Sequence, residues 1–511
     1  MFLRIIYSVV IINDMNNTRK IPRTMSTQHP DNVTMPFFTE GTSFNGEDEI
    51  KEAFYVFSHL RCDEQMWDCE GKEVDEFVIK KLLTRYDNYF KDHRIGKEVF
   101  ITLRVPNPVV EKSEAKILLE TLESAPRSYD TASLFYENNN DADPIPPIFE
   151  VILPMTTSAA SLNRVYYYYR DFVVGKQHKK CFENDITIKE WIGAFQPETL
   201  EVIPLFEDIP YMLSADAMVQ SYLTDKQLPY QRVFIGRSDP ALNYGLLPAV
   251  LVVKIALQRL HHLQEKIKIP IYPILGLGGN PFRGNLTPLS VDECLSEYPS
   301  VQTFTIQSAF KYDYDEDIVR NAIEKINNHP RRQPTVIDEE IALDIVERLT
   351  SAYREQIKEL APLINGIARF VPRRRMRKLH IGLFGYSRNV EGITLPRVIS
   401  FCASLYSIGL PPELLGLHCL TEKDVAFLKT ACPSFLDDVS LAASYYNRDV
   451  TKLISPKIAD NVARVLDMVK HTENILHSEY TAQIIRDIIS KKEDTITENI
   501  IVAGKVRRFL G

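Results

Sequence analysis

The chain has 511 residues, of which 45% are hydrophobic and 25% are charged, as in an ordinary globular protein. This length suits one large elaborated domain or roughly two to three smaller ones. A net charge of −8 argues against a dedicated nucleic-acid-binding protein, although residues 373–378 form one basic run, R-R-R-M-R-K. Seven cysteines without a C-x-x-C pair indicate neither a zinc site nor a disulfide framework, and reduced thiols of the cytosol fit best.

The first residues, M-F-L-R-I-I-Y-S-V-V-I-I-N-D, include an apolar stretch with no small-residue cleavage site, and it is too short to span a bilayer. We interpret residues 1–24 as an extension that is disordered or upstream of the native start, with a targeting segment as the alternative. The rest of the chain has no run of about 18 apolar residues, so we predict no transmembrane helix, no membrane partner and a cytoplasmic location.

Short apolar runs typical of buried strands recur at 99–104, 148–153, 201–207, 232–239, 269–275, 302–308 and 379–384. Helical patterns lie between most of them, at 112–124, 158–174, 213–224, 246–266, 316–328 and 336–363. This alternation favours a (β/α)8 barrel of the TIM type with additional helices over a doubly wound sheet, with the eighth strand hidden. After about residue 395 the pattern is helical, and no linker marks a boundary within 25–511, which we expect to form one domain.

Polar residues fall at or just beyond the ends of the predicted strands: Arg104, Glu207, Asp239, Gln307 and Arg388. In a barrel the carboxyl ends of all strands form one face, and active sites are built there. A strand-end charge that faces solvent is the simpler interpretation of each residue alone. Together they predict a single pocket.

Glu207 and Asp239 lie about one βα unit apart, so neighbouring strands of a barrel would carry them. Two carboxylates suit Mg²⁺ or Mn²⁺, whose remaining ligands are water and substrate oxygens. Such a metal would clamp an acidic substrate and neutralise enolate charge. The alternative is a carboxylate pair in structural ion pairs.

The glycine-rich segment I-L-G-L-G-G-N-P-F-R-G-N occupies residues 274–285. Pro281 stands where the third glycine of a dinucleotide-binding loop belongs, and no Gly-Lys-Ser/Thr follows for a P-loop. The glycines, Gly278 and Gly279 among them, would allow close approach of a ligand to the backbone. Arg283 would then supply a planar cation for a phosphate or carboxylate, unless this is an ordinary turn with a solvated arginine.

His29 lies in the polar segment M-S-T-Q-H-P-D-N, before a proline that disfavours helix. Its type makes it usable as an acid or base, although a plain surface histidine fits the pattern as well. The pair His261 and His262 lies in a helical pattern whose consecutive positions cannot share a face, so we interpret it as structural. No H-E-x-x-H motif for zinc occurs.

Several long motifs together resemble the short, archaeal-type phosphoenolpyruvate carboxylases, from Met25 to the last hundred residues. They are M-S-T-Q-H-P-D-N-V, C-D-E-Q-M-W-D-C-E-G-K-E-V-D, L-R-V-P-N-P, S-Y-D-T-A-S-L-F, V-I-P-L-F-E-D, R-S-D-P-A-L-N-Y-G and L-H-I-G-L-F-G-Y-S-R. The resemblance implies a carbon–carbon lyase (EC 4.1.1.31) that carboxylates phosphoenolpyruvate irreversibly with bicarbonate. It also implies a cytoplasmic homotetramer that uses Mg²⁺ or Mn²⁺.

The same resemblance assigns roles to single residues. His29 matches a catalytic histidine of the long carboxylases, and Glu207 and Asp239 match the two metal ligands. Arg283 matches the second arginine of the family's glycine-rich loop. Leu277 and Leu242 replace the loop's first arginine and a lysine of the long type. The remaining matches would bind substrate or phosphate: Arg104, Arg237 (a stand-in for the arginine missing at 277), Gly278, Gly279, Gln307, Arg388 and Arg397.

The implied mechanism begins when bicarbonate attacks the phosphate of phosphoenolpyruvate, which gives carboxyphosphate and a metal-stabilised enolate. His29 then removes the carboxyphosphate proton, and the enolate attacks the released CO₂ to give oxaloacetate. Arg283 would retain carboxyphosphate, and the glycine-rich loop would close over the site. Two alternatives stay open at this point: a related barrel lyase that acts on pyruvate enolates, and a non-catalytic assembly built on the helical C-terminal region.

Overall fold

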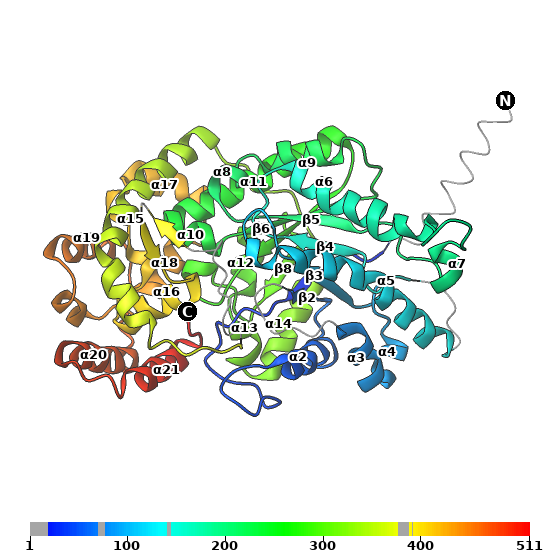
Figure 1. Ribbon diagram of the computed structural model, residues 1–511. Helices are drawn as coiled ribbons and strands as arrows, with labels where there is room; N and C mark the ends of the chain where they lie inside the picture. The colour runs from blue at the N-terminus through cyan, green and yellow to red at the C-terminus, as the bar shows by residue number, and fades with distance from the viewer. Residues whose placement is uncertain (1–18, 70–76, 140–144, 377–387, 391) are drawn as a thin grey trace.

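The computed structural model describes residues 19–69, 77–139, 145–376, 388–390 and 392–511. Eight strands pair in chain order and β1 also pairs with β8, so an all-parallel sheet closes into the predicted barrel (Figure 1). The strands are β1 (Thr24–Ser26), β2 (Glu64–Asp68), β3 (Phe100–Arg104), β4 (Glu150–Leu153), β5 (Glu201–Phe206), β6 (Gln231–Gly236), β7 (Ile271–Gly276) and β8 (Thr303–Ile306). A separate antiparallel hairpin is formed by β9 (Arg388–Val390) and β10 (Ile393–Leu395).

Six of the predicted strands are the barrel strands β3 to β8, whereas the run 379–384 lies outside the described residues. The sequence predicted one hidden strand, but two were missed, β1 and β2. β1 spans three residues, T-M-S, and β2 reads E-Q-M-W-D. Neither is the apolar run that a strand buried on both faces was expected to show.

The barrel interior explains why β2 is polar. Glu64, Glu150, Arg232 and Thr303 come from the starts of β2, β4, β6 and β8, and Arg232 hydrogen-bonds the other three. This is the layer of four side chains from alternate strands that closes one end of such barrels. An apolar layer follows, made of Met25, Met66, Ile152, Ile203, Leu205, Phe234 and Ile274. Inward positions of a strand are therefore charged at the amino end and apolar in the middle.

The barrel begins slightly ahead of the predicted boundary at Met25. Thr24 is the first residue of β1, and the side chain of Arg23, 8% exposed, donates a hydrogen bond of 3.0 Å to the backbone O of Val301. Residues 1–18 of the predicted extension lie outside the described part of the chain.

Helices cover the barrel, and the C-terminal helices pack together at one side of it (Figure 1). Those between the strands are α2 (Gly46–Ser58), α3 (Val78–Arg85), α4 (Asp87–Asp92), α5 (Ala115–Glu137), α6 (Ala159–Tyr167), α7 (Ile188–Ile192), α8 (Ile209–Met212), α9 (Ala215–Leu223), α10 (Ser238–Tyr244), α11 (Leu246–Ile267) and α12 (Val291–Glu297). After β8 come α13 (Ser308–Tyr312), α14 (Glu316–Asn328), α15 (Glu339–Ala368), α16 (Val398–Ser407), α17 (Glu422–Ala431), α18 (Phe435–Ala443), α19 (Pro456–Leu466), α20 (Ile475–Ser490) and α21 (Ile496–Arg507). As predicted, the chain beyond Leu395 is helical.

Helix α11 lies between the barrel and the C-terminal helices. It packs against β7 on one side and against α15 on another, and 15 of its 22 residues are buried. A helix that is apolar almost all round belongs in the core of a large protein or in a membrane. Among the described residues it is the one single helix long and apolar enough to cross a bilayer, and 83% of its apolar window is buried within the protein. Burial inside this fold accounts for its composition.

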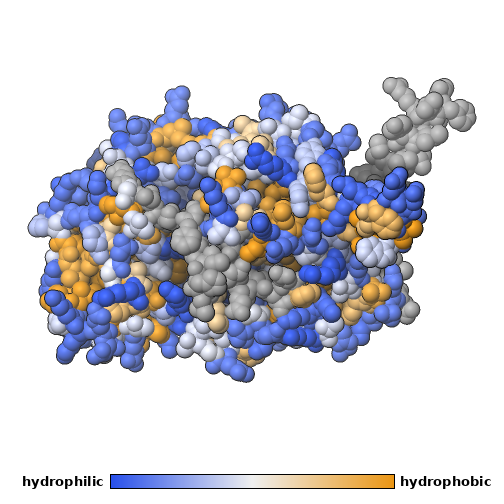
Figure 2. All heavy atoms as spheres, in the orientation of Figure 1, coloured by the Kyte–Doolittle hydropathy of each residue, from blue (hydrophilic) through white to orange (hydrophobic). Residues whose placement is uncertain are grey.

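The molecular surface in Figure 2 is mainly hydrophilic, with apolar residues in separate patches. One patch lies at the right-hand edge, where α7 is located, and Trp191 and Ile192 of this helix are more than half exposed.

Candidate active site at the carboxyl end of the barrel

Side chains at the carboxyl end of the barrel continue the inward alternation of the strands. Asp68 follows Met66 by two residues, and Glu207 follows Leu205 by two residues, where both Met66 and Leu205 face the barrel axis. Because a strand repeats every two residues, the next inward positions carry polar groups at the mouth. This register brings residues that are far apart in sequence to one opening.

The two predicted metal ligands follow the ends of two neighbouring strands, β5 and β6. β5 and β6 are paired up to Phe206 and Ile235, and a Cβ on Gly236 would lie 2.9 Å from Cγ of Glu207. Glycine at 236 therefore makes room for the Glu207 side chain. Asp239 lies in the first turn of α10, three residues further along, and both carboxylates are partly exposed.

A strained turn holds the Glu207 carboxylate. The backbone N–H of Met155 donates to Oε2 of Glu207 at 3.0 Å, and Met155 has φ +47°, which is uncommon for a residue with a side chain. The amide of Asn107, 1% exposed, donates to the carbonyl oxygens of Pro154 (2.8 Å) and Met155 (3.1 Å). Asn107 thus stabilises the turn that aims this N–H at Glu207.

These carboxylates fit a hard divalent cation by donor type. Within the described ranges no group of three or more His, Cys, Asp or Glu side chains could hold a metal. Mg²⁺ commonly takes only one or two protein carboxylates and completes its shell with water and substrate oxygens. The pair at the mouth has that composition.

Arg104 ends β3 and pairs with a residue that the sequence analysis did not select. Its Nη1 lies 2.9 Å from Oδ1 of Asp68, at the end of β2, and both side chains are only slightly exposed. The two-residue alternation from Glu64 would have pointed to Asp68, had residues 64–68 been recognised as a strand.

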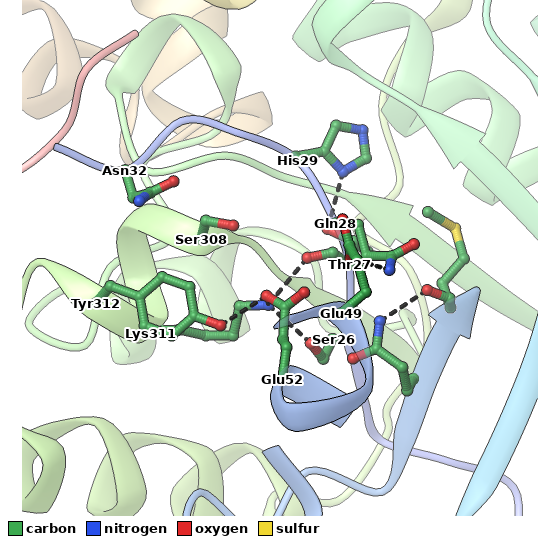
Figure 3. Close-up of polar contacts among 12 residues, drawn as sticks. Ser26, Thr27, Gln28, His29, Asn32, Glu49, Glu52, Ser308, Lys311 and Tyr312 are labelled. Carbon is green, nitrogen blue, oxygen red and sulfur yellow. Dashed lines mark hydrogen bonds and ion pairs between the residues drawn. The ribbon is translucent and has the colours of Figure 1, made fainter. Parts of the chain in front are cut away.

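His29 follows β1 at the same end of the barrel and is partly exposed. Its Nδ1 lies 2.8 Å from the hydroxyl of Thr27, so one ring nitrogen is held within its own segment (Figure 3). The contact fixes the direction of the ring. The neighbouring Gln28, Asp31 and Asn32 are all buried.

Arg283 is fully buried, and the glycine-rich loop folds around it. A Cβ on Gly278 would lie 2.8 Å from Cζ of Arg283, so a side chain at 278 would displace the guanidinium. Four of its five N–H groups already donate to acceptors of the protein. They are Oδ2 of Asp31 (3.1 Å), Oε1 of Gln307, the hydroxyl of Ser238 (3.3 Å) and the backbone O of Gly511 (2.9 Å).

Gly279 and Gln307 lie beside Arg283. A Cβ on Gly279 would come within 3.2 Å of the Ala309 side chain, in the first turn of α13. Gln307 is 3% exposed and precedes α13. Asp31, which sequence reasoning noted only as a neighbour of His29, accepts a hydrogen bond from the Ala309 N–H at 2.8 Å as well as from Arg283.

The side chain of Arg237 has different surroundings from that of Arg283. It lines a cavity of about 20 Å³ together with Asn285, Glu297 and Asp438, at the base of α18. Its Nη1 donates to the Pro281 carbonyl at 3.3 Å. A cavity of this size holds about one water molecule, and the residues around it do not include His29, Glu207 or Asp239.

Arg397 and Arg388 are placed by the elements that carry them. Arg397 immediately precedes α16, and the first turn of this helix lies against Gly511, whose backbone O accepts from Arg283. Arg388 begins β9, which lies beside α10 and hence close to the helix that carries Asp239. The side chain of Arg388 is outside the described atoms.

Known proteins of one family resemble this chain over nearly its whole length. Residues 21–511 match a family model described as phosphoenolpyruvate carboxylase. A phosphoenolpyruvate carboxylase of Methanospirillum hungatei is 52% identical over 96% of this chain and 100% of its own length. Those of Methanothermobacter thermautotrophicus and Pyrococcus furiosus are each 49% identical, again over 96% of this chain and 100% of theirs. The chain therefore belongs to the archaeal-type phosphoenolpyruvate carboxylase family.

Proposed function

We propose that the chain converts phosphoenolpyruvate and bicarbonate to oxaloacetate and phosphate at the carboxyl-end mouth of its barrel. Membership of the family makes it a carboxy-lyase, EC 4.1.1.31. The observation that carries the location is the shared inward register, which brings Asp68, Arg104 and Glu207 to one opening. We propose a cytoplasmic homotetramer, in keeping with the family resemblance.

Glu207 and Asp239 are the proposed ligands of a divalent cation, Mg²⁺ or Mn²⁺. When bound, such a cation neutralises negative charge that develops on the enolate oxygen and orients the phosphate. The protein contributes the fixed direction of Glu207, through the N–H of Met155. Glycine at 236 keeps the approach to this carboxylate open.

His29 is the proposed base of the second half-reaction. Its Nδ1 lies next to the Thr27 hydroxyl, and Nε2 is the proposed acceptor of the carboxyphosphate proton. A base that is placed within hydrogen-bonding reach contributes about 10²- to 10⁴-fold to such a step. Arg104 would bind the anionic substrate beside it, with Asp68 fixing its orientation.

Arg283 is proposed to act through its charge. Since four of its five N–H groups already donate to acceptors within the described part of the chain, it cannot form a two-pronged clamp on an anion without releasing a present partner. A buried guanidinium still favours negative charge nearby in a site from which water is excluded. Gly278 and Gly279 allow the backbone to remain close to it.

The decisive experiment measures phosphate and oxaloacetate together, with bicarbonate as the variable. Wild type should release both in equal amounts and only when bicarbonate is present. His29→Asn should continue to release phosphate from phosphoenolpyruvate while losing most oxaloacetate. Equal, normal output of both products from His29→Asn would exclude the proposed base.

A further inference from the structure

The side chain of Gln28 connects three elements next to His29. Its Oε1 accepts a hydrogen bond from the backbone N–H of Asp68 at 2.9 Å, and its Nε2 donates to Oε2 of Glu49 on α2. Gln28 is 1% exposed. Because Asp68 also pairs with Arg104, one amide links the His29 segment to the arginine of β3.

Glu49 belongs to a cluster of buried charges that faces the same segment. Arg375 donates to Glu49 at 2.6 Å and to both carboxylate oxygens of Glu52, at 2.7 and 2.8 Å. Lys311 lies 2.8 Å from Glu52. The four side chains are at most 5% exposed, and their formal charges cancel.

The ion pairs of the cluster favour the charged forms of Glu52 and Arg375. Burial alone would raise the pKa of Glu52, but Arg375 and Lys311 hold that pKa well below its usual value. Burial likewise opposes the charge of Arg375, yet Glu49 and Glu52 raise its pKa above the usual value. Buried charges need such pairing, since removal of one partner leaves the other desolvated and unpaired.

The cluster holds the backbone on both sides of His29. Lys311 donates to the hydroxyl of Ser26 (2.9 Å) and to the carbonyl of Thr27 (3.0 Å), just before the histidine. Arg374, next to Arg375 in sequence, donates to the carbonyls of Asn32 (3.3 Å) and Val33 (2.8 Å), just after it.

This arrangement also accounts for two members of the basic run at 373–378, Arg374 and Arg375. Arg374 and Arg375 are 5% and 4% exposed, so they form buried contacts and not an exposed basic patch. We propose that Gln28, oriented by Glu49 and Arg375, is a positioning residue that sets His29 relative to Arg104. This inference rests on the proposed role of His29.

The test is the ratio of phosphate to oxaloacetate, which a general loss of stability does not change. Gln28→Leu keeps the volume but removes the acceptor for Asp68 and the donor to Glu49. A small misplacement of a catalytic group can cost about 10²-fold, so we expect this ratio to rise by about tenfold. In the double variant with His29→Asn the ratio should equal that of His29→Asn alone, because both changes act through one group.

Two further variants make the result decisive. Gln65→Leu is the matched control, because Gln65 is also a fully buried glutamine, on β2, and its Nε2 donates to the Met66 carbonyl (2.7 Å). Its ratio of phosphate to oxaloacetate should stay that of wild type. Glu49→Leu removes the acceptor for Nε2 of Gln28 and leaves Arg375 paired with Glu52, so it provides the measurement if Gln28→Leu does not fold. Its ratio should also rise.

Proportional loss of both products in Gln28→Leu and Glu49→Leu, with uncoupling in His29→Asn, would overturn the positioning role alone. If His29→Asn itself remained coupled, the proposed role of His29 would be wrong, and the role of Gln28 with it.

Discussion

The pairing of Arg283 with Asp31 allows the structural and chemical parts of an arginine's contribution to be separated. The Asp31 carboxylate is 0% exposed and accepts hydrogen bonds from Arg283 and from the Ala309 N–H. In Arg283→Met the first of these bonds is lost and the second remains. Gln307 and Gly511 lose a donor at the same time. The change therefore leaves a buried charge unpaired.

The expected destabilisation is large. Removing one member of a buried ion pair typically costs about 3–5 kcal/mol, mostly because the remaining charge is desolvated. Asp31→Asn in the same chain replaces that carboxylate with a neutral amide, which can still accept from Ala309. The double variant Asp31→Asn/Arg283→Met should therefore regain most of the thermal stability that the single variant loses.

Activity should behave differently from stability. If the charge of Arg283 stabilises carboxyphosphate, its loss lowers kcat by about 10²- to 10³-fold, as for other preorganised donors. Adding Asp31→Asn would not restore this charge. The assays are the midpoint of thermal unfolding and the steady-state rate of oxaloacetate formation, both measured on all three variants. Recovery of kcat together with stability in the double variant would show that Arg283 has only a structural role.

Three further outcomes are expected. Glu207→Gln and Asp239→Asn should each raise the Mn²⁺ concentration needed for half-maximal activity, and should weaken Mn²⁺ binding measured by electron paramagnetic resonance; unchanged binding in both would show that the pair is misassigned. Asn107→Ala frees the turn at Met155 and should weaken Mn²⁺ binding in the same assay, with substrate saturation at excess metal little altered. Burial is the main cause that raises the pKa of Asp438 to about 7. In the unfolded chain this carboxyl has its usual pKa near 4, so between about pH 4 and 7 the folded state holds a proton that the unfolded state has released. The contribution of Asp438 to the free energy of unfolding therefore falls as pH rises from about 4 to 7. Asp438→Asn should remove that fall, and a pH dependence of unfolding identical to wild type would contradict it.

Local pattern was enough for six barrel strands and for the helices predicted between and after them, such as α11 and α15, but α2 and several short helices were not predicted. An apolar run bounded by turns, such as 201–207, needs little context, because its side chains are buried on both faces. β1 and β2 escaped prediction because their inward positions meet other polar groups: Glu64 is buried against Arg232, 168 residues away. A polar residue in a strand looks exposed until its partner across the barrel is known.

Some residues of the candidate site could likewise be predicted from sequence, and others could not. Strand-end positions such as Arg104 and Glu207 could be grouped from sequence, since all strands of a parallel barrel end at one face. The assignment of the metal to Glu207 and Asp239 came from their spacing and from motif resemblance, and that of the base to His29 from motif resemblance; both stay predictions. Asp68 was missed, because its strand was not recognised.

The amino-acid order of this chain by itself determined six of the eight barrel strands and which polar groups stand at their ends, because these depend on neighbours two to four residues away. The tertiary structure decides which charges meet. Arg283 and Arg237 lie near one another in the fold, yet the first pairs with Asp31 and the backbone of Gly511, and the second faces a cavity beside Asp438. Such partners come from segments more than 200 residues apart, and only the closed barrel brings them within hydrogen-bonding distance.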